Sequence, residues 1–268
     1  MLKPGFRNTT SNFIPAKPVQ SGTTLSTSPA HASQTTPKVE KPIAPYPFPS
    51  NFIFSEDEIK NSPSFRKHKI SADEEIILRR VGTCFIKQLT SRINKKIVVK
   101  QKQISARATC MAMVYFHRFY MYHSFTTFLP IEMATTCLFL ASKAEDCPKS
   151  INVFSDYYYR LTHNGEKLQE HEFEDVNPMI EAYEIRLLQT LAFEFRIELP
   201  HIAVINAPFH SQSDYLKKIA WRFSTDMLSF TTLCLQYDEK VLAAAAFYAA
   251  GAYLDIDVTI FIYSLSTA

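Results

Sequence analysis

The sequence has little glycine and no long apolar run, and each absence excludes a class of protein. Only five of the 268 residues are glycine, against 15 prolines. So few glycines leave no glycine-rich phosphate-binding loop and disfavour a strand-rich fold with many tight turns. No apolar stretch approaches the roughly 20 residues that span a bilayer, and residues 1–30 lack the apolar segment of a signal peptide. We therefore expect no membrane partner.

Catalytic and metal-binding patterns are missing as well. The sequence contains neither the G-x-S-x-G of a hydrolase nor the H-E-x-x-H of a zinc protease. Its eight histidines are scattered, and no two are four residues apart. We predict no catalytic residue, no metal site, no cofactor and no small-molecule substrate, so the chain is interpreted as a non-enzyme.

The cysteines are too few and too irregularly spaced for a disulfide framework. There are five of them, an odd number, and no C-x-x-C occurs. Most lie among apolar residues, where a free cysteine behaves as a small hydrophobic side chain. This usage is typical of a reducing compartment, the cytosol or the nucleus.

The charge is small and unevenly distributed. The net charge of +3 arises from a net +4 in residues 1–50, which leaves −1 for residues 51–268. A nucleic-acid-binding domain usually has a basic footprint, so a nucleic-acid partner is not expected. The local exception is Arg92–Lys102, which carries five cations and no acid. It is interpreted as a solubilising surface, with RNA or an acidic protein as the alternative partners.

Residues 1–50 differ in composition from the rest. They hold nine of the 15 prolines and 13 serines or threonines, without apolar periodicity. This composition predicts a disordered tail.

From Phe52 onward the apolar residues repeat at helical spacing. Ser55 before an acidic turn, and Ser71 three residues before Glu74, are helix-start patterns. Ser71 begins a long helix, and its expected inner face consists of Ile77, Val81, Cys84, Phe85, Leu89 and Ile93. Further helices are predicted from Ser105, from Pro130, over residues 148–162, near Pro178, over 214–232 and over 238–254.

A weak internal repeat relates the two halves of this region. The Ala-rich stretch 138–143 has a counterpart at 246–251. Small side chains suit a helix that neighbours surround on several sides. The sequence therefore predicts an all-α protein of two stacked helical bundles.

Five segments together resemble the transcriptional cyclins of the cyclin K and cyclin T group, in the family's order. They are EIKNSPS (58–64), VYFHRFYMYHSF (114–125), CLFLASKAED (137–146), EIRLLQTLAFEF (184–195) and AWRFSTDMLSFTTLCLQ (220–236). The resemblance implies two tandem cyclin boxes, a first over 51–198 with an N-terminal helix and a second over 199–268. The stretch 256–268 does not resemble the family, so the second box is expected to be incomplete.

The resemblance also implies a function. A cyclin of this group binds and activates a cyclin-dependent kinase that phosphorylates the C-terminal repeat of RNA polymerase II, which promotes transcription elongation and places the protein in the nucleus. The alternative is a cyclin-fold transcription adaptor that binds DNA or polymerase without a kinase. The −1 charge of residues 51–268 argues against that alternative.

By position in the family pattern, Lys143 and Glu184 correspond to the pair that holds the kinase's regulatory helix in its active position. A kinase needs the lysine of its third strand paired with a glutamate of that helix before ATP is held correctly. A partner that binds the active position better shifts the kinase toward it. Glu145 and Asp146 correspond to the acidic pair that follows the lysine.

Four other residues receive roles from the same comparison. Phe139 and Phe193 are expected to add apolar contact area for the kinase, with core packing as the alternative. Arg79 and His117 occupy positions where many cyclins have a buried arginine–acid pair. Here the pair would be arginine with histidine, so both are interpreted as structural, without strong attraction between them.

Overall fold

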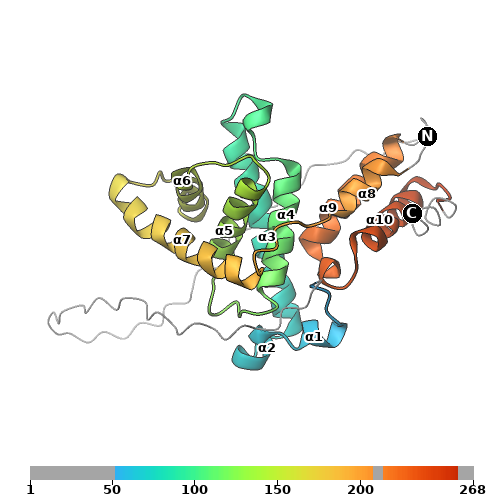
Figure 1. The fold of residues 1–268 in the computed structure, drawn as a ribbon, viewed down its shortest axis with the longest axis horizontal. Helices are drawn as coiled ribbons and strands as arrows, with labels where there is room; N and C mark the ends of the chain where they lie inside the picture. Colours follow the sequence, from blue (N-terminus) through green and yellow to red (C-terminus); the bar gives the residue numbers. More distant parts are fainter. Residues whose placement is uncertain (1–51, 208–213, 259–268) are drawn as a thin grey trace. The chain divides into compact units, whose positions relative to one another are not determined.

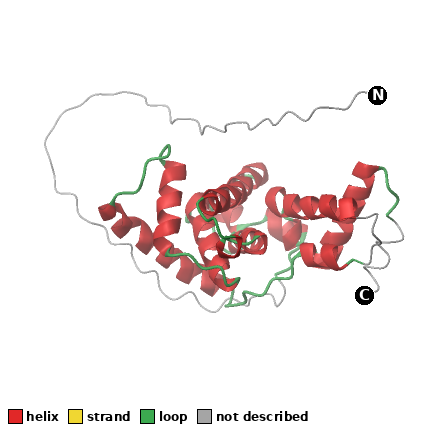
Figure 2. Ribbon diagram, turned by 90° about the horizontal axis from the view of Figure 1, so that it is seen from above, coloured by secondary structure: helices red, strands yellow, loops and turns green. Residues whose placement is uncertain are grey.

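The computed structural model describes residues 52–207 and 214–258. The predicted tail, residues 1–50, and most of the stretch 256–268 lie outside the described residues. Within the described part the chain forms helices and no strand, which confirms the all-α prediction (Figures 1 and 2). The α-helices are α1 (Glu56–Lys60), α2 (Pro63–His68), α3 (Ala72–Lys95), α4 (Ala106–Phe119), α5 (Pro130–Ala144), α6 (Ile151–Thr162), α7 (Phe173–Thr190), α8 (Pro200–Asn206), α9 (Asp214–Phe230) and α10 (Glu239–Leu254). The same described residues contain three short 3₁₀ turns, η1 (Lys100–Lys102), η2 (Glu170–Glu172) and η4 (Leu233–Leu235).

Helix starts follow the side chains that precede them. Ser55 and Ser71 each accept a hydrogen bond from the backbone N–H three residues later, and Glu58 and Glu74 return a bond to the cap, so both form complete capping boxes. Asp238 caps α10 in the same way, through the N–H of Val241. These local bonds set where each helix begins.

The central helix of the first bundle is α5. Ten of its 15 residues are buried, from Met133 to Ser142. It packs against α3, α4 and α7, with α6 alongside (Figure 1). Small residues such as Ala134 and Ala141 are fully buried, which lets the neighbouring helices approach on several sides. The prediction of a small-residue central helix is confirmed for this bundle.

The predicted inner face of α3 is wrong in its N-terminal half. Ile77 is 57% exposed and Val81 is 36% exposed. The buried side of this half carries Glu75, Arg79 and Gly82 instead. The inner side is occupied by the Glu75–Arg79 ion pair and by the Phe116 ring, which packs against Gly82. The two aliphatic side chains therefore point to solvent. Leu89 and Ile93, in the second half, are buried as predicted.

A second, smaller core lies among α8, α9 and α10. Its fully buried members include Ala220, Ala243 and Phe247. Phe230, the last residue of α9, is 41% exposed, and the Lys87 ammonium lies 5.0 Å from its ring centre. The assignment of this region as an incomplete second cyclin box stays a prediction, as do the box boundaries.

Side chains of the first bundle close the end of α9. The last carbonyls of a helix have no intrahelical partner. Here the Leu228 carbonyl accepts from His117 at 2.9 Å and the Ser229 carbonyl accepts from Thr83 at 2.6 Å. The Phe230 carbonyl accepts from Arg80 at 3.2 Å. Three successive orphan carbonyls are thus satisfied by α3 and α4, which fixes where the second core attaches.

Candidate functional site

The C-terminal end of α5 meets α7 through an ion pair between Lys143 and Glu184. The Lys143 side chain is 40% exposed and that of Glu184 is 14% exposed, so the pair lies at the surface with its carboxylate recessed. The lysine ammonium also lies 4.2 Å above the ring of Phe139. Lysine in the last turn of a helix is favoured by the helix dipole. The structure therefore places in direct contact the two residues that the family pattern selected as a pair.

Phe139 is mainly a core residue. Its side chain is 8% exposed, and its ring meets that of Phe154 on α6 edge to face at 5.2 Å. Beneath the Lys143 ammonium it offers a partner little area of its own. The ring therefore positions the lysine from below and packs into the core.

Glu145 and Asp146 follow α5 in different environments. Glu145 accepts an ion pair from Arg107, at the start of α4, at 3.0 Å. Asp146 is exposed and adopts a left-handed backbone (φ 51°). The Cys147 N–H returns to the Ser142 carbonyl at 2.9 Å and closes the turn. Arg107 was not selected from the sequence, since nothing in the local pattern links it to a residue 38 positions away.

Phe193 lies just beyond the end of α7 and is 64% exposed. Its N–H donates to the Leu188 carbonyl at 3.1 Å, and the Ala192 N–H donates to the Gln189 carbonyl at 3.2 Å. These two bonds are a Schellman motif, which ends the helix. Ala192 and Phe193 both have positive φ, 51° and 60°. The aromatic ring is therefore presented to solvent by a fixed turn.

Exposed Ile185, on α7 beside Glu184, was missed from the sequence. It is 59% exposed. The helical spacing could have identified it. A residue next to Glu184 lies about 100° further around the helix axis, away from the inner stripe of Ile180 and Leu187. An apolar residue there belongs to no core.

Arg79 and His117 are buried, away from this surface. The Arg79 guanidinium pairs with Glu75 at 2.6 Å and donates to the His117 carbonyl at 3.1 Å. Glu75 also accepts from Ser62. The buried ion pair therefore exists within α3. The i, i+4 spacing of Glu75 and Arg79 was the signal that could have found it. Burial lowers the pKa of His117 to about 3, helped by the neighbouring guanidinium, so this ring is neutral near pH 7.

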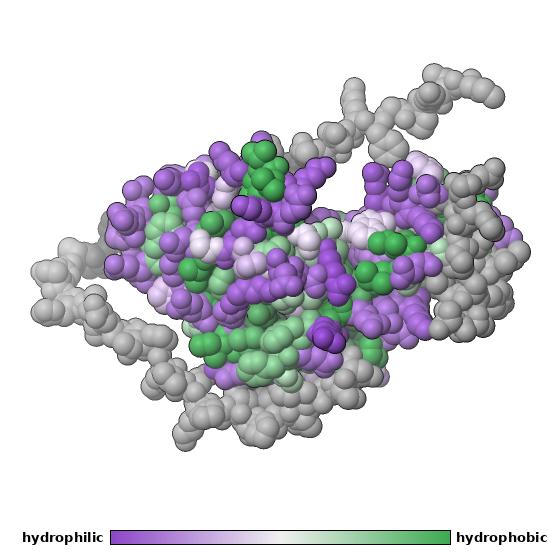
Figure 3. Space-filling view, turned by 45° about the horizontal axis from the view of Figure 1, so that its top comes forward, coloured by the Kyte–Doolittle hydropathy of each residue, from purple (hydrophilic) through white to green (hydrophobic). Residues whose placement is uncertain are grey.

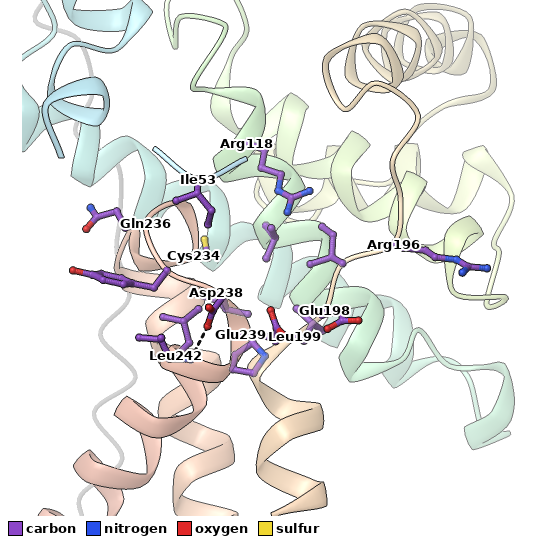
Figure 4. A pocket seen from close by; sticks show the side chains of 16 residues that line it. Ile53, Arg118, Arg196, Glu198, Leu199, Cys234, Gln236, Asp238, Glu239 and Leu242 are labelled. Atoms are coloured by element: carbon purple, nitrogen blue, oxygen red, sulfur yellow. Dashed lines mark hydrogen bonds between the residues drawn. The ribbon is translucent and has the colours of Figure 1, made fainter. Parts of the chain in front are cut away.

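A cavity of about 470 Å³ lies elsewhere, between α4, residues 196–200 and the start of α10. Figure 4 shows Arg118 at one edge and Asp238 and Glu239 near its other side. The Arg118 guanidinium lies 4.4 Å from the ring centre of Phe52. In the described part of the chain, no His, Cys, Asp and Glu cluster could hold a metal, and no helix is long and apolar enough to cross a bilayer.

Comparisons with known proteins point to one family. The model of the family "Cyclin, N-terminal domain" matches residues 96–196. Human Cyclin-T2 is 31% identical over 205 residues, which cover 75% of this chain and 27% of that protein. The chain belongs to the cyclin family. Its resemblance to the transcriptional cyclin K and cyclin T group is confirmed.

Other relatives agree. Cyclin-T of Drosophila melanogaster is 30% identical, over 74% of this cyclin and 17% of that protein. Cyclin-T1.1 of Caenorhabditis elegans is 26% identical, over 78% of this cyclin and 45% of that protein. The chain spans less than half of the length of these relatives. The matched range 96–196 contains Lys143, Glu184 and the other residues of the surface described above.

Solved structures share the fold. A chain of the yeast RNA Pol II CTD kinase CTDK-1 complex superposes with a TM-score of 0.64 at 21% identity, over 78% of this cyclin and 65% of that chain. A chain of the yeast TFIIK (Kin28/Ccl1/Tfb3) complex superposes with a TM-score of 0.52 at 14% identity, over 81% of this cyclin and 93% of that chain. At these identities the likeness shows the fold of the cyclin.

Proposed function

We propose that this cyclin is the non-catalytic regulatory subunit of a cyclin-dependent kinase that phosphorylates the C-terminal repeat of RNA polymerase II, in the nucleus, and so promotes transcription elongation. The observation that carries the proposal is the recessed ion pair between Lys143 and Glu184 at the junction of α5 and α7. The cyclin T relatives and the fold shared with a subunit of a polymerase CTD kinase complex support it.

The docking surface comprises the Lys143–Glu184 ion pair, Glu145, Asp146 and the exposed side chains of Ile185 and Phe193. Lys143 keeps 40% of its side chain accessible, so its ammonium has donors left for carbonyls at the end of the kinase's regulatory helix. Ile185 and Phe193 extend the surface with apolar area, at 59% and 64% exposure. Asp146 is free to accept a hydrogen bond or ion pair from the kinase.

Activation follows from differential binding. A kinase is active only when its regulatory helix brings the glutamate to the ATP-binding lysine. A surface that binds the helix in that position, and not in the inactive one, shifts the population by its difference in affinity. The cyclin then supplies no catalytic group.

The deciding experiment mixes the full chain with candidate transcriptional kinases and measures phosphorylation of a polymerase repeat peptide. Three variants are compared with the wild type: Lys143→Glu, Glu184→Lys and the two together. Each single change should remove most activation, because a mismatched charge pair in an interface costs about 2–5 kcal/mol.

The double variant separates an interface role from a structural one. It restores an ion pair of opposite polarity within the cyclin and so restores folding stability. It also presents the inverted charge pattern to the kinase, so activation should stay lost. Recovery of activation in the double variant would make the pair structural only. No binding by folded wild type would favour the adaptor that binds DNA or polymerase without a kinase.

A further inference from the structure

The last turn of α3 and the connection from it toward α4 form a basic projection with an apolar tip. Its exposed cations are Arg92, Lys95, Lys96, Lys100 and Lys102. Between them Val98 is 94% exposed and Val99 is 49% exposed. Figure 1 shows the connection extending beyond the ends of the neighbouring helices, and Figure 3 shows an apolar patch surrounded by hydrophilic atoms where it comes toward the reader. We call residues 92–102 the basic projection.

The projection is held in place by hydrogen bonds of Asn94, near its start, and of Gln103, directly after its end. The Asn94 amide donates to the Ile104 carbonyl at 2.9 Å and accepts from the Ile104 N–H at 2.8 Å. The Gln103 amide donates to the Ile97 carbonyl at 2.9 Å. Ile93 and Ile104, 1% and 3% exposed, anchor its two ends in the core. A solubilising loop needs no such bracing, whereas a binding surface gains from it because less conformational entropy is lost on association.

The projection starts from the same end of the bundle as the docking surface. Arg107, in the first turn of α4 after the projection, pairs with Glu145 directly after Lys143's helix, at 3.0 Å. A partner seated on Lys143 and Glu145 is therefore within reach of the projection. None of its five cations forms an ion pair with a described residue.

We propose that the basic projection is a second contact for the kinase, docking onto an acidic kinase surface with an apolar recess for Val98. This inference rests on the proposed function. Charge complementarity predicts that the contacted kinase surface is acidic, since five unpaired cations favour carboxylates. The valine tip favours a protein partner. Single-stranded nucleic acid is bound by stacking on aromatic side chains, and residues 92–104 contain none.

The test uses the kinase that the full chain activates, immobilised, and measures association and dissociation rates. Lys96→Glu with Lys100→Glu should lower the association rate about 10-fold or more at low salt. The difference should shrink to less than about 2-fold near 0.5 M salt, where charges are screened beyond a few Å. Val98→Ser should instead raise the dissociation rate about 5-fold, because it removes apolar contact area.

The matched control is Lys218→Glu with Lys240→Glu. Both of these lysines are exposed, on α9 and α10, and the change in net charge is the same. Equal rates for the projection variant and this control overturn the inference. A second outcome also overturns the inference. The wild type and the control would bind a single-stranded RNA oligonucleotide, the projection variant would not, and its kinase rates would be unchanged, so that the partner of the projection would be a nucleic acid. Absence of wild-type binding, or unchanged activation by Lys143→Glu, removes the proposed function itself.

Discussion

His117 on α4 donates its Nε2–H to the carbonyl oxygen of Leu228 in the last turn of α9, at 2.9 Å. The acceptor is a carbonyl and the ring is neutral, so Nδ1 carries no proton. Nδ1 faces the Arg79 guanidinium at 3.4 Å. A second proton on this ring would point at a cation. One neutral histidine thus joins the first bundle to the helix of the second core.

The first prediction concerns acid stability. The pKa of His117 is lowered to about 3 by burial, and burial lowers those of His123 and His201 to about 3 and about 4. The unfolded chain therefore takes up these protons first, and the free energy of unfolding falls as pH drops below about 6.5. The loss is at most about 1.4 kcal/mol per pH unit for each histidine.

Urea unfolding between pH 6.5 and 5 checks this, above the range where carboxylates titrate. His117→Gln should show a shallower dependence on pH, because glutamine keeps a donor for the Leu228 carbonyl and binds no proton. The exposed His163→Gln serves as control and should keep the wild-type slope. An identical slope in all three proteins would contradict the assignment of His117 as neutral and buried.

A second prediction concerns the buried ion pair on α3. Glu75→Gln leaves the Arg79 guanidinium buried without its charge partner, at a cost of about 3–5 kcal/mol in the free energy of unfolding. Asp73→Asn, an exposed acid in the same first turn, should change stability by less than about 0.5 kcal/mol. Chemical denaturation measures both. A loss below 1 kcal/mol for Glu75→Gln would mean that water reaches the arginine.

A third prediction concerns the glycine where α3 meets α4. A Cβ placed on Gly82 would lie 2.0 Å from Cζ of Phe116, whose ring is fully buried. Gly82→Ala should therefore destabilise by about 1–3 kcal/mol, although alanine favours a helix by about 1 kcal/mol. Adding Phe116→Leu should recover part of the loss by shortening the side chain that clashes. Ser91→Ala, exposed on the same helix, is the control and should be neutral or slightly stabilising.

The fourth prediction separates binding from stability at the end of α7. Ala192→Gly and Phe193→Gly both relieve a left-handed residue and should stabilise the protein by about 0.5–1 kcal/mol. Only Phe193→Gly removes an exposed ring. Kinase activation should therefore fall in Phe193→Gly and stay unchanged in Ala192→Gly. Equal activation by the two variants would exclude Phe193 from the docking surface.

The helices and their starts could be predicted from the sequence because their causes are local. Ser55 and Ser71 cap within three residues, and Pro130 begins α5, where its missing N–H costs no helical hydrogen bond. The start of α7 was less well predicted, since that helix begins at Phe173 and contains Pro178 in its interior. The all-α class follows from the same periodicity. Lys143 and Glu184 were selected by position in the family pattern, which retains information that spacing alone does not contain.

What only the tertiary structure decided depends on contacts between distant residues. Periodicity assigned Ile77 and Val81 inward, since it weighs apolar character and not the pairing of Glu75 with Arg79 behind them. Other contacts also join residues far apart in the chain. Arg107 pairs with Glu145, and His117 and Thr83 donate hydrogen bonds to the last carbonyls of α9. The sequence by itself determined the helical class, the helix starts and the family. Packing decided which residues face inward and which charges remain free for a partner, because burial is a property of the assembled helices.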